Sequence, residues 1–425
     1  MQQRDVSLKK CVWMILFLAL FAGSAQAENW PRFRGPNGQG ISEAATIPVK
    51  WSEQDYNWRI ELPGVGHSSP VVWGDRIFVT CADGKRMRGI LLCVSAADGR
   101  ELWRKEYGLE KVAMNSLNNY ASSTPALDAE HVYLFWPGAG ETMLAALTHD
   151  GREVWTVELP AIEARHGTGS SPIVVGEHVI ISREQDVKSG GDLASVWLAL
   201  GRKDGQVRWR YSHPENANAS YSTACTYRDA QGREQLIFTS NLHGVAGVDP
   251  QTGRLLWKTE GVLPARVVSS PVIADNIIVG TCGTGGRGVR LAAVKPPGAD
   301  GSAGTEVYGL ERGVVSYVPT AVSRDGLLFL FHDQGTISCL RAGTGEKLWS
   351  EKPAGRFFGS PVCVDSKLYC ITIDGEVVVL RAAPKYELLA VNPLGEKSHA
   401  TPAVANGRMY LRTLSHLISV GGDRR

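Results

Sequence analysis

The residues of this chain best suited to chemistry stand in eight loops, each just ahead of a similar short sequence segment. They are cationic, aromatic or amide-bearing: His67, Asn119, Tyr120, Arg165, His166, Tyr221, Arg266, Tyr317, Arg356, Lys397 and His399, with Phe357 beside Arg356. Guanidinium groups and aromatic rings that converge on one point hold an anionic planar ligand through charge-assisted hydrogen bonds and stacking. Glu163 and Glu396 are the nearest carboxylates, and no Asp stands in the set to serve as a general base.

Three interpretations of these residues are open. They line a water-filled channel or cap local backbone, they form a binding surface for a ligand or a protein, or they surround a redox cofactor. Calcium needs several oxygen ligands, carboxylates among them, and no Cys/His grouping has the spacing of metal ligands. We therefore predict no catalytic residue and no metal site.

The eight segments that follow these loops define a repeat. They have the form Ser/Thr-x-Pro or an equivalent, recur at intervals of 41 to 55 residues, and occupy 68–70, 123–125, 170–172, 222–224, 269–271, 317–319, 359–361 and 400–402. Each opens a short run of apolar, β-branched residues, and turn residues separate these runs from the next ones. A period of this length is typical of propeller blades or a solenoid.

The second half of the repeat carries a tryptophan. In five repeats an Asp-Gly or Thr-Gly pair precedes it, with the glycine four residues ahead of Trp103, Trp155, Trp209, Trp257 and Trp349. Such pairs supply the positive φ angles of tight hairpins, and the indole is predicted to pack between neighbouring sheets. The corresponding segments 304–308 and 385–389 lack the pattern and are interpreted as degenerate copies.

The sequence thus predicts an all-β protein, an eight-bladed β-propeller of four-stranded antiparallel blades. The last repeat ends near Val420 without its outer strand, whereas residues 56–62, around Trp58, read as an outer strand without a blade. We predict that this N-terminal strand completes the last blade and closes the ring, which leaves no open sheet edge. The predicted divisions are a signal peptide (1–27), a lead-in segment (28–50) and a single propeller domain (51–425).

The N-terminus predicts export to the periplasm or the cell exterior. Arg4, Lys9 and Lys10 precede an apolar core at 12–22, and a small-residue cleavage site ends at Ala27. The core is too short to span a bilayer, and Cys11 precedes it, so no lipidation cysteine is predicted. The mature protein is expected to be a monomer without a membrane span.

Charge and cysteine content narrow the function further. Lys and Arg total 45 against 43 Asp and Glu, so nothing indicates a nucleic-acid partner. Seven cysteines follow the signal peptide, mostly in apolar strand contexts, and are interpreted as buried free thiols, with a Cys81–Cys93 disulfide as the alternative to check first. The glycine-rich segment 280–288 is interpreted as a hairpin crossing and not a phosphate loop, since no helix follows it.

The repeat resembles that of the pyrroloquinoline quinone (PQQ) propellers, the quinoprotein alcohol dehydrogenase-like superfamily. The resemblance rests on Ser-Ser-Pro-Val-Val-x-Gly-Asp at 68–75 and Ala-Ala-Asp-Gly-Arg-Glu-Leu-Trp at 96–103, and covers about 51–420. The segment 29–38 resembles the Trp-Pro-x-x-Arg-Gly-Pro lead-in of exported members. The superfamily contains quinone-dependent dehydrogenases as well as non-catalytic scaffolds such as BamB, an outer-membrane assembly lipoprotein.

For the dehydrogenases, the resemblance implies a vicinal Cys-Cys disulfide over the cofactor, carboxylate and Asn ligands to calcium, and an Asp base. This chain has no Cys-Cys pair. We therefore expect an exported, non-catalytic binding or scaffold propeller without a cofactor, whose partner is an envelope protein, a carbohydrate or an anionic small molecule. The alternative is a PQQ-dependent oxidoreductase, with calcium, acting on an alcohol or a sugar.

Overall fold

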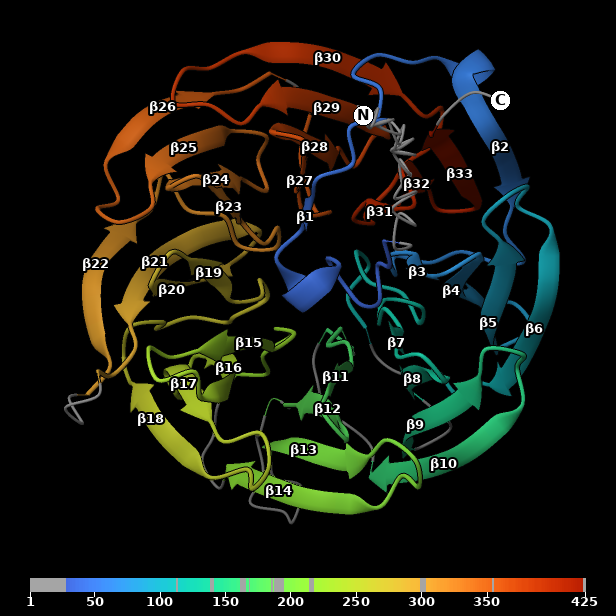
Figure 1. Cartoon of the computed structure of the whole chain (residues 1–425), viewed down its shortest axis with the longest axis horizontal. Coiled ribbons are helices and arrows are strands. Elements are labelled where there is room, and N and C mark those ends of the chain that lie inside the picture. Colours follow the sequence, from blue (N-terminus) through green and yellow to red (C-terminus); the bar gives the residue numbers. More distant parts are fainter. Residues whose placement is uncertain are drawn as a thin grey trace, which may run out of the picture.

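The ring of eight blades predicted from the repeat is the architecture of the protein (Figure 1). The computed structural model describes residues 28–111, 114–137, 141–160, 166–167, 169–184, 186, 195–213, 218–298, 303–353 and 355–422. The predicted signal peptide, residues 1–27, lies outside the described residues. In the described part of the chain, no helix has the length and apolar character of a membrane span.

Each blade is a meander of four antiparallel strands, with the first strand nearest the axis. Blades one to four consist of β3 (Val71–Trp73), β4 (Arg76–Asp83), β5 (Arg88–Ser95) and β6 (Glu101–Gly108); β7 (Ala126–Leu127), β8 (His131–Pro137), β9 (Glu141–Thr148) and β10 (Glu153–Pro160); β11 (Ile173–Val175), β12 (His178–Arg183), β13 (Ser195–Gly201) and β14 (Val207–His213); and β15 (Cys225–Arg228), β16 (Glu234–Ser240), β17 (Gly244–Val248) and β18 (Leu255–Thr259).

The second half of the ring repeats this arrangement. Blades five to eight consist of β19 (Val272–Ala274), β20 (Ile277–Thr284), β21 (Arg287–Lys295) and β22 (Thr305–Glu311); β23 (Val322–Arg324), β24 (Leu327–Phe331), β25 (Ile337–Arg341) and β26 (Lys347–Glu351); β27 (Val362–Val364), β28 (Lys367–Ile371), β29 (Glu376–Arg381) and β30 (Leu388–Pro393); and β31 (Ala403–Ala405), β32 (Arg408–Arg412), β33 (His416–Gly421) and β2 (Tyr56–Glu61).

The N-terminal strand closes the ring as predicted. β2 pairs antiparallel with β33, the last strand of the chain, and Trp58 stands opposite Ser419. Trp58 is 9% exposed and packs against Tyr410 of blade eight, with ring centroids 6.0 Å apart. Blade eight therefore combines both ends of the described chain.

The repeated tryptophans join neighbouring blades, also as predicted. The indole N–H of Trp103 donates to the backbone oxygen of His149 in the next blade at 2.8 Å, and Trp155 reaches Arg202 in the same way at 3.0 Å. The turn glycine of the next blade lies against the indole, since a Cβ on Gly151 would come within 2.8 Å of Trp103. In the fifth blade, interpreted as degenerate, Tyr308 takes over this contact and donates to Ala342 O at 2.6 Å.

The structure also agrees with the predictions made for the glycine-rich segment 280–288 and for the cysteines. Residues 280–288 form the hairpin between β20 and β21, with Gly285 and Gly286 at positive φ in its turn. All seven described cysteines are buried and free, Cys81 and Cys93 included. The thiols therefore act as small core side chains.

Candidate functional site

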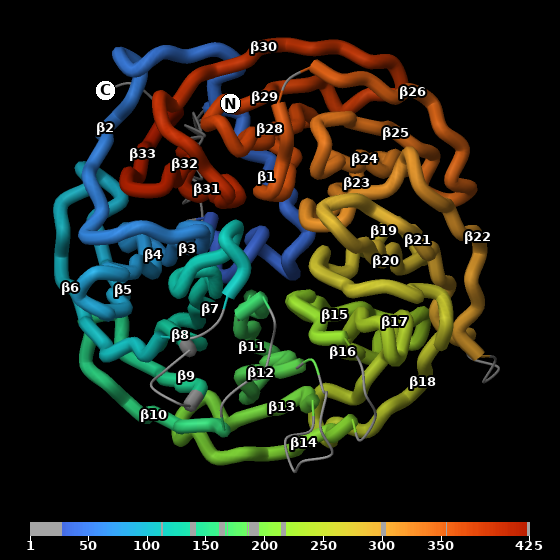
Figure 2. Tube along the Cα trace, turned by 180° about the vertical axis from the view of Figure 1, so that it is seen from behind, coloured from blue at the N-terminus to red at the C-terminus, as the bar shows by residue number. Residues whose placement is uncertain are grey.

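The lead-in segment crosses the axis of the ring and closes one end of it, a role that the sequence did not reveal. The 3₁₀ helix η1 (Pro36–Gly38) lies at the centre of the propeller in Figure 1, and Figure 2 shows this segment behind the inner strands from the opposite side. The strand β1 (Ile41–Ser42) then adds to blade seven, parallel to β27. A second 3₁₀ helix, η2 (Glu53–Asp55), leads into β2.

Arg34 fixes the lead-in at the axis. Its side chain is fully buried and donates to five backbone oxygens at 2.7 to 3.1 Å, those of Gly38, Gln39, Thr320, Ala321 and Pro361. Burial lowers the pKa of this guanidinium to about 9, so it remains charged at neutral pH. One cation thereby joins the lead-in to the inner edges of blades six and seven.

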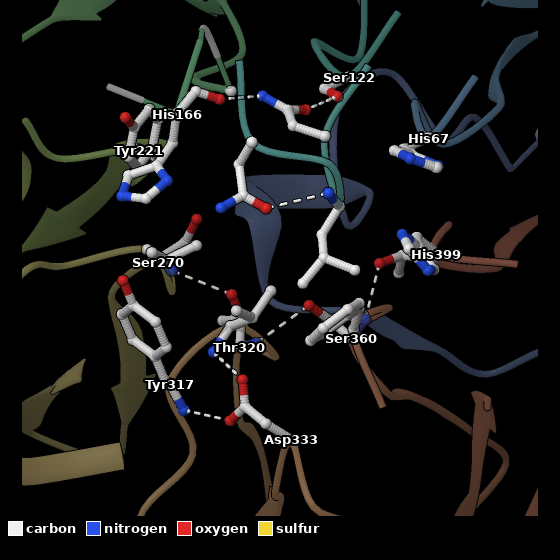
Figure 3. A pocket seen from close by; sticks show the side chains of 18 of the residues that line it. His67, Ser122, His166, Tyr221, Ser270, Tyr317, Thr320, Asp333, Ser360 and His399 are labelled. Carbon is white, nitrogen blue, oxygen red and sulfur yellow. Dashed lines mark hydrogen bonds between the residues drawn. The ribbon is translucent and has the colours of Figure 1, made fainter. Parts of the chain in front are cut away.

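Above the lead-in, the axis holds a cavity of about 710 Å³. Seven of the eleven residues predicted from the sequence line it: His67, His166, Tyr221, Arg266, Tyr317, Arg356 and His399. Figure 3 shows these imidazoles and phenols on loops from several blades around one space. Phe33 of the lead-in belongs to the same lining. The loops before the inner strands thus do converge at the axis.

One side of the cavity is a network centred on Arg266, from the loop before β19. Its guanidinium pairs with Asp186 at 2.8 Å and donates to Nε2 of His166 at 2.6 Å. The rings of Tyr221 and His166 lie edge to face, and burial raises the pKa of both Tyr221 and Tyr317. Both phenols therefore keep their protons at neutral pH and remain hydrogen-bond donors.

The other side holds two histidine rings in contact, tilted by 30° to each other, beside a cation. The rings of His67 and His399 are 4.4 Å apart, and Phe358 meets His399 edge to face at 4.9 Å. Burial, reinforced by His399, lowers the pKa of His67 to about 3, and burial also lowers that of His399. Both imidazoles are neutral at pH 7, so the exposed Arg356 supplies the positive charge on this side.

The remaining predicted residues lie elsewhere. Asn119 accepts the Ala121 N–H within its own turn, and the neighbouring Asn118 lines the cavity instead. Tyr120 packs against the hydrophobic cluster of blades one and two, and Lys397 is exposed outside the lining. Arg165 lies outside the described residues, as does Glu163.

Two expectations about individual residues were wrong. Phe357 is fully buried against Phe331, with ring centroids 5.2 Å apart, and Phe358 is the ring at the cavity. An Asp does stand in the wall: Asp333, from the turn between β24 and β25, lines the cavity. The sequence analysis considered only the loops before the inner strands and so missed a side chain from this hairpin.

Asp333 stabilises the backbone of the loop before β23. Its two carboxylate oxygens accept the backbone N–H groups of Tyr317 and Val318 at 2.8 and 3.0 Å. Burial raises its pKa to about 6 in spite of these bonds. This Asp holds the loop that carries Tyr317, with each carboxylate oxygen accepting one backbone N–H.

The residues present do not fit calcium-bound PQQ. Calcium prefers several oxygens, including carboxylates that are free to coordinate it. Here Asp333 is engaged by backbone and Asp186 by Arg266, and no group of three or more His, Cys, Asp or Glu suited to a metal occurs among the described residues. The cationic and aromatic groups do fit an anionic organic molecule.

The fold and this closed-ended axial cavity define a ligand-sized site within an eight-bladed propeller. A family model described as outer membrane protein assembly factor BamB matches residues 55–245, 245–385 and 333–424, and the chain belongs to this family of PQQ-repeat propellers. No curated protein matches the chain.

Solved structures share the fold at low sequence identity. BamB from Moraxella catarrhalis is 17% identical, with a TM-score of 0.60 over 86% of this chain and 97% of that one. Quinohemoprotein alcohol dehydrogenase from Comamonas testosteroni is 13% identical, with a TM-score of 0.69 over 94% and 81%. Similarity at this level establishes the propeller and leaves function to the site.

Proposed function

We propose that this protein is an exported, non-catalytic binding propeller whose axial cavity takes a small anionic ligand with a ring system. The cavity itself carries the proposal. It is closed at one end by the lead-in, measures about 710 Å³, and combines Arg266 and Arg356 with neutral imidazoles and phenols. A concave site with a few convergent polar groups suits a small molecule better than a broad protein surface.

The charges in the cavity support an anion in particular. Arg266 is matched by Asp186, whereas Arg356 is exposed and has no ion-pair partner among the described residues. An anion entering the cavity would gain the attraction of Arg356 without displacing an existing carboxylate. The neighbouring rings of His67 and His399, with Phe358, offer aromatic surface next to that charge.

The second candidate is a PQQ-dependent oxidoreductase. The observation in its favour is that PQQ is itself an anionic planar molecule, of the class that these residues suit. Asp333, which holds backbone N–H groups, and Asp186, which pairs with Arg266, already serve structural roles, and this counts against the calcium and the base that such an enzyme employs. A protein that binds PQQ without calcium and without turnover would still be a binding protein.

Calorimetric titration of the purified protein tests the proposal. The panel consists of PQQ with and without calcium, acidic monosaccharides and neutral glucose, and dye reduction with alcohols and sugars is measured in parallel. We expect saturable binding of an acidic compound, independent of calcium and without dye reduction. Turnover would establish the oxidoreductase instead, and binding of no anion in the panel would refute the proposed function.

Arg356→Ala is the matched variant. We expect it to weaken binding of the acidic compound roughly tenfold, because a charge-assisted hydrogen bond is lost. Arg100→Ala, which removes an exposed cation from an outer turn of blade one, is the control and should bind normally. Arg266→Ala is less informative, since it would also leave Asp186 unpaired.

A further inference from the structure

A closed circle of hydrogen bonds surrounds the axis. In seven blades, the residue before the last position of the repeat segment donates its backbone N–H to the hydroxyl of the corresponding residue in the next blade. In blade six this role falls to Thr320, which follows Pro319 and precedes Ala321, so the repeat in this blade starts two residues later than the sequence suggested. The eight bonds measure 2.9 to 3.2 Å and join Ser69, Thr124, Ser171, Thr223, Ser270, Thr320, Ser360 and Thr401, from which the circle returns to Ser69. We call these eight residues the hydroxyl ring; Figure 3 shows three consecutive members, Ser270, Thr320 and Ser360.

The hydroxyl ring forms part of the cavity wall. All eight side chains line the cavity, yet each residue is at most 7% exposed. A hydroxyl carries one proton and two lone pairs, and the neighbouring N–H occupies one lone pair. Among the described residues, none accepts a hydrogen bond from any of the eight hydroxyls. Buried donors without acceptors are costly, so the ring requires water or a ligand to complete it.

The chemistry of the ring selects its ligand. Eight donors around one axis suit a group rich in acceptor oxygens and without competing protons. The carboxylate in the same wall, that of Asp333, accepts two backbone N–H groups, and no ring hydroxyl among the described residues donates to it. The positive charge of Arg356 acts in the same direction, because it favours negative charge inside the cavity.

We propose that the hydroxyl ring binds the oxyanion group of the ligand, a carboxylate, a sulfate ester or a phosphate ester. This inference rests on the proposed function, since it assigns the deep end of the same cavity. The anionic group then lies among the ring hydroxyls, and the remainder of the ligand extends toward the aromatic residues His67, His399 and Tyr317. The ring therefore both joins the blades and recognises the ligand.

The competing explanation is that the ring only joins the blades and is filled by water. Variants that separate the hydroxyl from the side-chain shape decide between the two. Thr124→Val and Thr320→Val remove a ring hydroxyl, whereas Thr124→Ser and Thr320→Ser retain it. Ser270→Ala is matched by Ser269→Ala, a neighbour whose hydroxyl bonds to Thr281 and does not line the cavity.

Titration with glucuronate, glucose 6-sulfate, glucose 6-phosphate and glucose is the measurement. We expect the acidic sugars to bind and glucose not to, and the compound that binds most tightly identifies the oxyanion. Thr124 and Thr320 lie on opposite sides of the hydroxyl ring, so one oxyanion contacts only one of them. One of the two Val variants should therefore bind that compound at least tenfold more weakly, because it loses a hydrogen bond to a charged group, and Ser270→Ala should behave as its ring neighbour Thr320→Val does. The Ser variants and Ser269→Ala should bind as the parent does.

Three outcomes contradict the inference in distinguishable ways. If the Val variants bind as tightly as the parent while Arg356→Ala binds weakly, the cavity is a ligand site but the ring is not its oxyanion subsite. If no acidic sugar and no other anion binds, the proposed function fails with it. Should the variants not fold, the parent soaked with selenate decides: an anomalous peak at the ring hydroxyls supports the inference, and a peak at Arg356 alone, or none, overturns it.

Discussion

At the residue scale, Glu184 and Asp333 are buried carboxylates that act in a similar way. Glu184, 6% exposed, accepts from the Trp197 indole at 3.1 Å and from the Ser220 backbone at 3.2 Å. Asp333 holds the loop of blade six in a comparable way. Both carboxylates satisfy backbone donors of loops that lead to inner strands, so their burial serves the position of those loops.

Glu184 gives a testable pH dependence. Burial raises its pKa from 4.5 to about 7, so the folded protein holds this proton more tightly than the unfolded chain does. The resulting stabilisation is complete below pH 4.5 and is lost as the pH rises through 7. Glu184→Gln cannot titrate, so its stability relative to the parent should rise by about 2–3 kcal/mol between pH 5 and pH 8.

Urea unfolding at both pH values measures this difference. Glu106→Gln, which changes an exposed carboxylate on β6, is the control and should follow the parent at both pH values. An unchanged difference between Glu184→Gln and the parent would mean that Glu184 is ionised with an ordinary pKa in the folded protein.

At the element scale, the lead-in segment closes one end of the axial cavity. It adds β1 to blade seven, places Phe33 in the cavity lining and inserts Arg34 among five backbone oxygens. A guanidinium satisfies several acceptors at once because its donors are fixed in a planar fork. Arg34 therefore makes more hydrogen bonds to the blades than a single-donor side chain could, and it acts beside the buried Trp30 of the same segment.

Arg34→Met should lower the free energy of unfolding by at least ~3 kcal/mol, since it leaves several buried carbonyls without donors. Arg34→Lys keeps the charge without the fork and should be intermediate. Both values come from urea titration at pH 7. Parental stability for Arg34→Met would show that the lead-in is not held through this residue.

At the scale of the whole molecule, closure of the ring depends on a pairing between the two ends of the chain. β2 covers the edge of β33, and the hydroxyl ring returns from Thr401 to Ser69 across the same junction. An uncovered strand edge offers unpaired backbone groups to other chains. A protein with this junction removed should therefore associate through the exposed edge.

Deletion of residues 51–62 tests this by light scattering after gel filtration. We expect oligomers or aggregates, because blade eight loses its outer strand. Arg59→Ala is the matched control: it changes an exposed side chain of β2 and leaves the pairing with β33 intact, so the ring should stay closed and the protein monomeric. A monomeric, stable 51–62 deletion would mean that blade eight closes in another way.

The sequence by itself determined the blades, their number and the closing strand. The repeat encodes the same local structure in most blades: a Pro just before the inner strand, a Gly-containing turn, and an indole at a fixed distance after that turn. The seven residues found at the cavity could be named in advance because they occupy one position of that repeat, and propeller symmetry brings equal positions together.

Only the tertiary structure decided what fills and closes the centre. Arg34 meets carbonyls 286 to 327 residues away, and no periodic pattern encodes contacts over that separation. Asp333 and Phe358 stand one turn or one residue from the positions considered, where side-chain direction decides which of two neighbours faces the axis. Each repeat contributes one Ser or Thr to the hydroxyl ring. These residues form a circle of hydroxyl groups only when the eight blades close around a common axis.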